Sequence, residues 1–311
     1  MSGGHIPVGV PVAWPNPPAS LVPGGDRART GATTVTRQAR HASSRTGRRA
    51  LAAVRESLSA RDWDVLRVVA RHRYLTTRQI EAWHFHDHAT PLTGARVCRR
   101  VLRRLAELRV LDPLERRIGG VRAGSASFVW QAGPAGDRLL HEQASRPRRR
   151  QREPGRLFLR HCLAVADAHL ALVRARRSGG LELVTVQTEP ECWRPFTGLG
   201  GARLVLQPDL YVVTGDPVDP AFVNCWFVEV DRGTENAARL LSKCGRYESY
   251  RRTGIEQADG DSFPLVVWVM ADDAQAERLG AAIRRHSGLD DRLYRVTTAA
   301  RFTGLIRGGA A

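Results

Sequence analysis

Lysine is almost absent from this sequence, because Lys243 is the only lysine among its 48 basic residues. Its five cysteines form no CxxC pair, which argues against both a zinc ribbon and a secreted disulfide framework. No run approaches the roughly 18 apolar residues that span a bilayer. A GxxxxGK[ST] phosphate loop is also missing, so we expect no ATPase. Reduced thiols and the lack of an export signal favour a cytoplasmic protein.

Basic residues are abundant, and the formal net charge of the 311 residues is +17 with a pI near 11.1. Such a charge favours a polyanionic partner whose counterions are released on binding, and double-stranded DNA is the first candidate. A membrane is not expected, because the basic helices carry no broad aromatic face. Codon usage can also raise the arginine content, so net charge alone is weak evidence.

Composition and pattern divide the chain into four segments. Residues 1–57 lack apolar periodicity and are predicted to form a disordered basic tail. Residues 58–142 and 157–306 contain periodic apolar residues and are predicted to form two domains, joined by a basic linker at 143–156.

The first domain shows the order helix, helix, helix, hairpin. Ser59 can cap a helix that ends near His72, and Thr76 and Gln79 have the spacing of a capping box. The run 93–109 predicts an amphipathic basic helix, and a hairpin with a glycine-rich tip follows. This is the order of a winged helix-turn-helix, in which the third helix enters the major groove and the wing follows the backbone. The predicted DNA contacts are Arg96, Arg99, Arg100, Arg103 and Arg104 on the helix, and Arg117 and Arg122 on the wing. The alternative is a helical bundle with a solvated basic face.

The second domain alternates helices and strands, which predicts an α/β fold with a mixed central sheet. The expected helices cover 157–176, 234–251 and 273–286, and the expected strands cover 181–187, 204–213, 224–230, 265–270 and 293–296.

Three polar residues should meet at one edge of this sheet. Asp209 begins one strand, Glu229 lies near the end of the next, and Lys243 lies on the helix that follows. Two carboxylates can hold Mg²⁺ or Mn²⁺, and an ammonium can orient water and stabilise a scissile phosphate. This is a phosphodiesterase layout, although its lysine usually stands two residues after the glutamate, where this chain has Asp231. The alternative is an acidic pair on the strand matched by Arg232 or Arg239.

Segments 207–209, 227–235 and 243–247 resemble the replication-relaxation family, which is often linked to plasmids and other mobile elements, and the resemblance covers about 58–305. It implies a winged helix joined to a restriction-endonuclease-like domain of the PD-(D/E)xK kind. By that resemblance Asp209 and Glu229 would bind the metal and Asp231 would add an oxygen donor. Lys243 would take the role of the displaced lysine. Glu189 or Glu191 could supply a further acid.

Histidines rank lower as site residues. His84, His86 and His88 alternate along the chain, a spacing that does not converge three imidazoles on a metal. His161, Asp167 and His169 are interpreted as solvent or cap positions of the helix 157–176.

The leading hypothesis is a DNA-binding replication or mobilisation factor of a bacterial chromosome or plasmid, with a metal-dependent endonuclease or nickase centre. Two alternatives remain open. One is a DNA-binding accessory without catalysis, and the other is a transcriptional regulator that uses the α/β domain to form a homodimer. Replication or conjugation proteins are further candidate partners.

Overall fold

The computed structural model describes residues 47–118, 127–141, 154–215, 223–260 and 262–308, with the backbone alone at 115–118, Ser127 and Leu199. All of them belong to one unit, Thr46–Ala311. None of the described helices combines the length and apolar character needed to cross a membrane.

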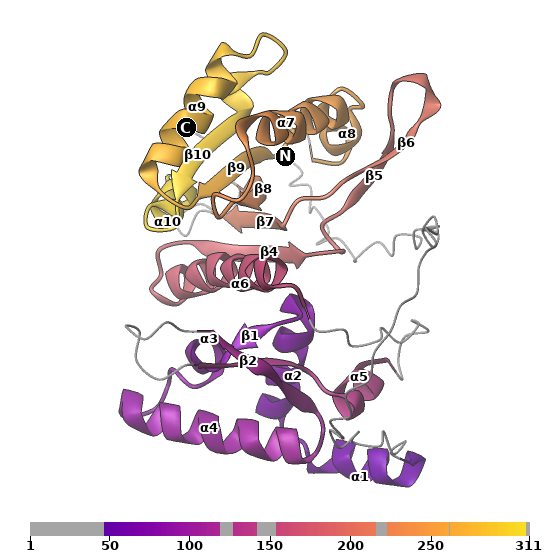
Figure 1. Cartoon of the computed structure of the whole chain (residues 1–311), viewed down its shortest axis with the longest axis vertical. Coiled ribbons are helices and arrows are strands. Elements are labelled where there is room, and N and C mark those ends of the chain that lie inside the picture. Colours follow the sequence, from indigo (N-terminus) through magenta and orange to yellow (C-terminus); the bar gives the residue numbers. More distant parts are fainter. Residues whose placement is uncertain (1–46, 119–126, 142–153, 216–222, 261, 309–311) are drawn as a thin grey trace, which may run out of the picture. The chain divides into compact units, whose positions relative to one another are not determined.

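The N-terminal part contains helices joined by a small antiparallel sheet of strand order β1-β3-β2 (Figure 1). Its elements are α1 (Arg48–Ser57), α2 (Ala60–His72), β1 (Leu75–Thr76), α3 (Thr77–His84), α4 (Pro91–Glu107), β2 (Leu111–Ile118), β3 (Ser127–Ala132) and α5 (Pro134–His141). Helices α2, α3 and α4 followed by the β2–β3 hairpin give the element order that the sequence predicts.

Local capping fixes where two of these helices begin. The Ser59 side chain accepts a hydrogen bond from the Asp62 backbone N–H, and the Asp62 carboxylate accepts one from the Ser59 N–H in return. Thr76 and Gln79 form the same reciprocal pair at the start of α3. Each box satisfies amide groups that have no partner within the helix, and the capping box predicted at Thr76 is confirmed.

Helix α1 lies inside the segment predicted to be a disordered tail, so that prediction extends too far. Leu51 is buried and Val54 is partly buried, and both pack into the core of the N-terminal helices. Two apolar residues one helical turn apart suffice to dock a short helix. The remaining tail, residues 1–46, lies outside the described residues, as does most of the predicted linker, residues 142–153.

The C-terminal part is built on a mixed five-stranded sheet of order β10-β9-β8-β7-β4 (Figure 1). Strands β8, β9 and β10 run parallel, whereas β7 is antiparallel to both β8 and β4. The α/β class with a mixed sheet is thereby confirmed. The elements are α6 (Arg156–Arg177), β4 (Glu182–Thr188), β5 (Arg194–Thr197), β6 (Arg203–Leu206), β7 (Leu210–Gly215), β8 (Val223–Val230), α7 (Ala237–Arg251), α8 (Ile255–Gly260), β9 (Leu265–Met270), α9 (Asp273–Arg285), β10 (Tyr294–Thr298) and α10 (Phe302–Arg307), with 3₁₀ turns at Leu199–Gly201 and Asp291–Leu293.

The strand predicted at 204–213 is two strands. Strand β6 pairs with β5 in a separate ribbon, and β7 enters the main sheet after Pro208 and Asp209. Proline cannot donate a ladder hydrogen bond, so a break at Pro208 is physically reasonable.

Each face of the sheet is covered by helices. Trp226 and Val228 of β8 share a core with α6 and α10, whereas Phe227 of the same strand packs with α7 and α9. Alternation along β8 therefore directs Glu229 toward the side of α7.

Helix α6 also packs against the N-terminal helices. Its Ala166 and Leu170 belong to the same core as residues of α2 and α3. His72 and His169 face each other with ring nitrogens 3.0 Å apart, and burial lowers the pKa of both imidazoles. The Gln79 Nε2 group donates to Asp167 Oδ1 at 2.7 Å. His169 is therefore a buried packing residue between α6 and α2, which corrects its interpretation as a solvent or cap position, whereas Asp167 is exposed, as that interpretation expects, and contacts α3 through Gln79.

Candidate functional site

Helix α4 carries a stripe of exposed arginines. Thr90 caps the helix by accepting from the Thr93 N–H, and Pro91 occupies its first turn, where no amide donor is needed. The buried face consists of Gly94, Cys98, Leu102 and Leu105. Gly94 is required there, because a Cβ would lie 2.5 Å from the carbonyl oxygen of Phe85.

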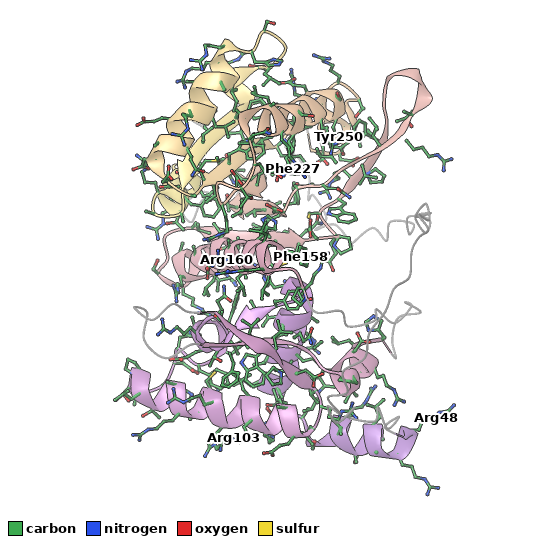
Figure 2. All side chains as sticks on the ribbon, in the orientation of Figure 1. Arg48, Arg103, Phe158, Arg160, Phe227 and Tyr250 are labelled. Atoms are coloured by element: carbon green, nitrogen blue, oxygen red, sulfur yellow. The ribbon has the colours of Figure 1, made fainter. Side chains whose placement is uncertain are left out.

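Four of the predicted DNA-contact residues lie on the outer side of this helix. They are exposed, and the spacings of three and four residues between 96 and 99, 96 and 100, 99 and 103, and 100 and 103 place them on one side of the helix. Figure 2 labels Arg103 on α4. The four are Arg96, Arg99, Arg100 and Arg103, which we call the arginine stripe.

Arg104 is placed differently from the stripe. Its Nη2 atom lies 2.5 and 2.6 Å from the two carboxylate oxygens of Asp62, a residue of α2 that is only 1% exposed. The guanidinium therefore neutralises a buried acid and ties α4 to α2. The Arg104 side chain is still 44% exposed, so it combines this internal ion pair with a place on the outer side of α4, and its predicted contact with DNA stays a prediction.

Of the two predicted wing residues, the structure describes only the backbone of Arg117. The backbone of Arg117 belongs to β2, but its side chain lies outside the described part, and Arg122 lies outside it altogether.

Asp209 stands at the entry of β7 with both carboxylate oxygens engaged. Oδ2 accepts the backbone N–H of Val230 at 2.7 Å, and Oδ1 lies 2.9 Å from Nε2 of His161 on α6. This hydrogen bond raises the pKa of His161, while partial burial opposes the shift.

Glu229 is buried close to Asp209. Its Oε1 accepts a 2.7 Å hydrogen bond from the Tyr247 hydroxyl, and its Oε2 lies 3.7 Å from the Lys243 ammonium. Burial, followed by the charge of Asp209, raises the pKa of Glu229 to about 8. Lys243 also lies 3.4 Å from Glu235, and the nearby carboxylates raise its pKa even though burial opposes them. The structure thus brings Asp209, Glu229 and Lys243 together. We call these three residues and His161 the acidic centre.

The remaining predicted acids differ in position. Glu189 lines the same small cavity as His161 and Asp209, and its carboxylate pairs with Arg73 at 3.4 Å. Burial raises the pKa of Glu189, while the charge of Arg73 opposes the shift. Glu191 is exposed. Asp231 Oδ1 receives a 3.4 Å contact from the Thr234 N–H, while its buried Oδ2 has no hydrogen-bond partner among the described residues.

The fit of a divalent cation can be tested on the carboxylate oxygens themselves. Oxygen donors are the type that Mg²⁺ and Mn²⁺ prefer, but all four oxygens of Asp209 and Glu229 already face a protein donor. Within the described ranges no three His, Cys, Asp or Glu side chains are grouped to hold a metal ion. A cation held by Asp209 and Glu229 would have to use the second lone pair of these oxygens and to lie beside the Lys243 ammonium, which contacts Glu229.

His161 is the residue of this centre that the sequence analysis missed. It lies 48 positions before Asp209 in the sequence, and a single histidine on an amphipathic helix gives no sign of which strand end it will face.

Comparison with family models finds a match over residues 66–266 to the model described as replication-relaxation. Comparison with the curated proteins and with the solved structures finds no match. The matched segment covers more than half of the chain and contains α3, α4 and all four residues of the acidic centre. The chain therefore belongs to the replication-relaxation family.

Proposed function

We propose that this chain is a double-stranded DNA-binding protein that grips DNA with the arginine stripe of α4. The family assignment supports a role related to DNA replication or mobilisation. The element order supports a winged helix with α4 as its recognition helix. Its proposed place of action is the cytoplasm, on nucleoid or plasmid DNA.

The stripe is the observation that carries this proposal. Four exposed guanidinium groups on one face of a 17-residue helix are well suited to bidentate contacts with phosphates and guanine edges. Arginine holds its charge at every relevant pH. The net charge of +17 would add attraction at longer range.

The test is the affinity of the full chain for a fluorescently labelled duplex. Replacing Arg99, Arg100 and Arg103 by alanine should weaken binding roughly tenfold or more. The matched control removes the same charge from α9, where Arg278, Arg284 and Arg285 are also exposed. Equal losses in both triple variants would mean that only net charge matters and would overturn the assignment of α4.

Metal-dependent DNA cleavage is a second candidate, favoured by the convergence of Asp209, Glu229 and the only lysine of the chain. The displaced lysine, which stands on α7 while Asp231 holds the place two residues after Glu229, favours a DNA-binding accessory that does not cut, and we rank that function first. Nicking of supercoiled plasmid with Mg²⁺ or Mn²⁺ decides between them. Nicking by the wild type that Lys243→Ala and Glu229→Ala both abolish would establish the nuclease. DNA retention without nicking would support the accessory.

A further inference from the structure

The N-terminal end of α4 presents an unusual surface. Leu92, its second residue, is 72% exposed, the highest value among the large apolar side chains of the described chain. Single exposed leucines are common on protein surfaces, so the feature that carries the argument is the position of Leu92 beside the arginines of α4. Thr90 and Pro91 hold this turn of the helix in place, so the position of Leu92 is well defined by the backbone.

Leu92 lies in line with the arginine stripe. Arg96, Arg99 and Arg103 follow it at spacings of 4, 7 and 11 residues, all of which return to the same side of a helix with 3.6 residues per turn. The line is about 16 Å long at 1.5 Å per residue. It points away from the buried face at Cys98 and Leu102, so among the described residues the core that packs against α4 does not cover Leu92.

The neighbours of Leu92 identify what could cover it. A surface rich in guanidinium groups is complementary to a phosphate backbone, and a helix of this size fits the major groove of B-DNA. The residues at the N-terminal end of such a helix are those that contact base edges. Within the major groove the apolar group that bases present is the C5-methyl group of thymine.

We propose that Leu92 is a specificity residue that packs against a thymine methyl group in the major groove, while the arginines behind it contact phosphates and guanine. The inference rests on the proposed function, because it deepens DNA binding by α4 into recognition of a sequence. Leu92 selects thymine without a hydrogen bond, and its contribution is independent of salt.

The experiment begins with selection of duplexes from a randomised pool by the full-length wild type. Each thymine of the selected site is then replaced by deoxyuridine, which lacks only the methyl group. At one position this change should weaken wild-type binding about fourfold, the value expected for losing one buried methyl contact. Leu92→Ala should bind the thymine and deoxyuridine duplexes equally well at that position.

The control is Leu204→Ala, which removes a second exposed leucine from β6 and should leave the thymine preference unchanged. Undiminished discrimination in Leu92→Ala, or a selected site that tolerates deoxyuridine everywhere, would overturn the role of Leu92 while DNA binding itself stands. Failure of the wild type to retain any duplex would instead overturn the proposed function and this inference with it. Circular dichroism of Leu92→Ala checks that the helix is intact.

Discussion

The Nε2 atom of His161 lies 2.9 Å from Oδ1 of Asp209, so the second turn of α6 is hydrogen-bonded to the entry of β7. Two turns further along the same helix, His169 packs against His72 of α2. One helix therefore contacts both the acidic centre and the N-terminal helices, and Arg73 after α2 also reaches Glu189 beside that centre.

Replacement of His161 by glutamine should change stability in a pH-dependent way. The hydrogen bond to Asp209 raises the pKa of His161 in the folded chain above its ordinary value of 6.5. The added stability is therefore fully present below pH 6.5 and is lost as the pH rises through the folded-state pKa. At pH 6 the variant should be less stable by about 1 kcal/mol, since the imidazole is partly exposed. Thermal melts at pH 6 and pH 9 measure this, and a difference that does not shrink at pH 9 contradicts it.

Replacement of Glu229 by glutamine should stabilise the fold in alkaline solution. Burial and the charge of Asp209 raise the pKa of Glu229 from 4.5 to about 8. The folded state therefore binds a proton more tightly than the unfolded chain, and stability falls as the pH rises between these values. The amide removes the titration, so the Tm of the variant should exceed that of the wild type by a few degrees at pH 8.5 and by less at pH 5. A variant that melts lower at every pH would show that the charged carboxylate stabilises the fold.

Replacing the neighbours Arg103 and Arg104 by alanine should change the folding free energy by different amounts. Arg104→Ala leaves the buried Asp62 carboxylate without its guanidinium, which should cost about 2 kcal/mol of folding free energy. Arg103→Ala removes an exposed side chain of the stripe and should leave stability nearly unchanged. Urea unfolding of both variants measures the difference, and equal midpoints would remove the structural role of Arg104.

Sequence patterns predict the parts of this fold that depend on neighbouring residues. The Thr76–Gln79 capping box is present because both partners lie in one turn. The strand at 265–270 was predicted with the bounds that the structure shows, since its apolar run ends where Asp272 caps the next helix. The proximity of Lys243 to Glu229 could be predicted, because the strand and the helix that carry them follow one another in the sequence.

Contacts between segments that are distant in the sequence could not be predicted from such local patterns. The amphipathic pattern of α4 separates buried from exposed positions, but it does not reveal that Arg104 pairs with Asp62 of α2. The same holds for His161, whose partner belongs to a strand in another part of the chain. Helix α1 was missed because Leu51 and Val54 stand in a segment otherwise dominated by arginine, alanine and polar residues.

The salt dependence of duplex binding shows whether the arginine stripe contacts DNA phosphates. Each phosphate contact contributes about 0.9 to the slope of log K against log salt concentration. The slope of the variant lacking Arg99, Arg100 and Arg103 should therefore be flatter than that of the wild type by about 2 to 3, while the variant lacking Arg278, Arg284 and Arg285 keeps the wild-type slope. An unchanged slope in the α4 variant would mean that the arginine stripe does not contact phosphates.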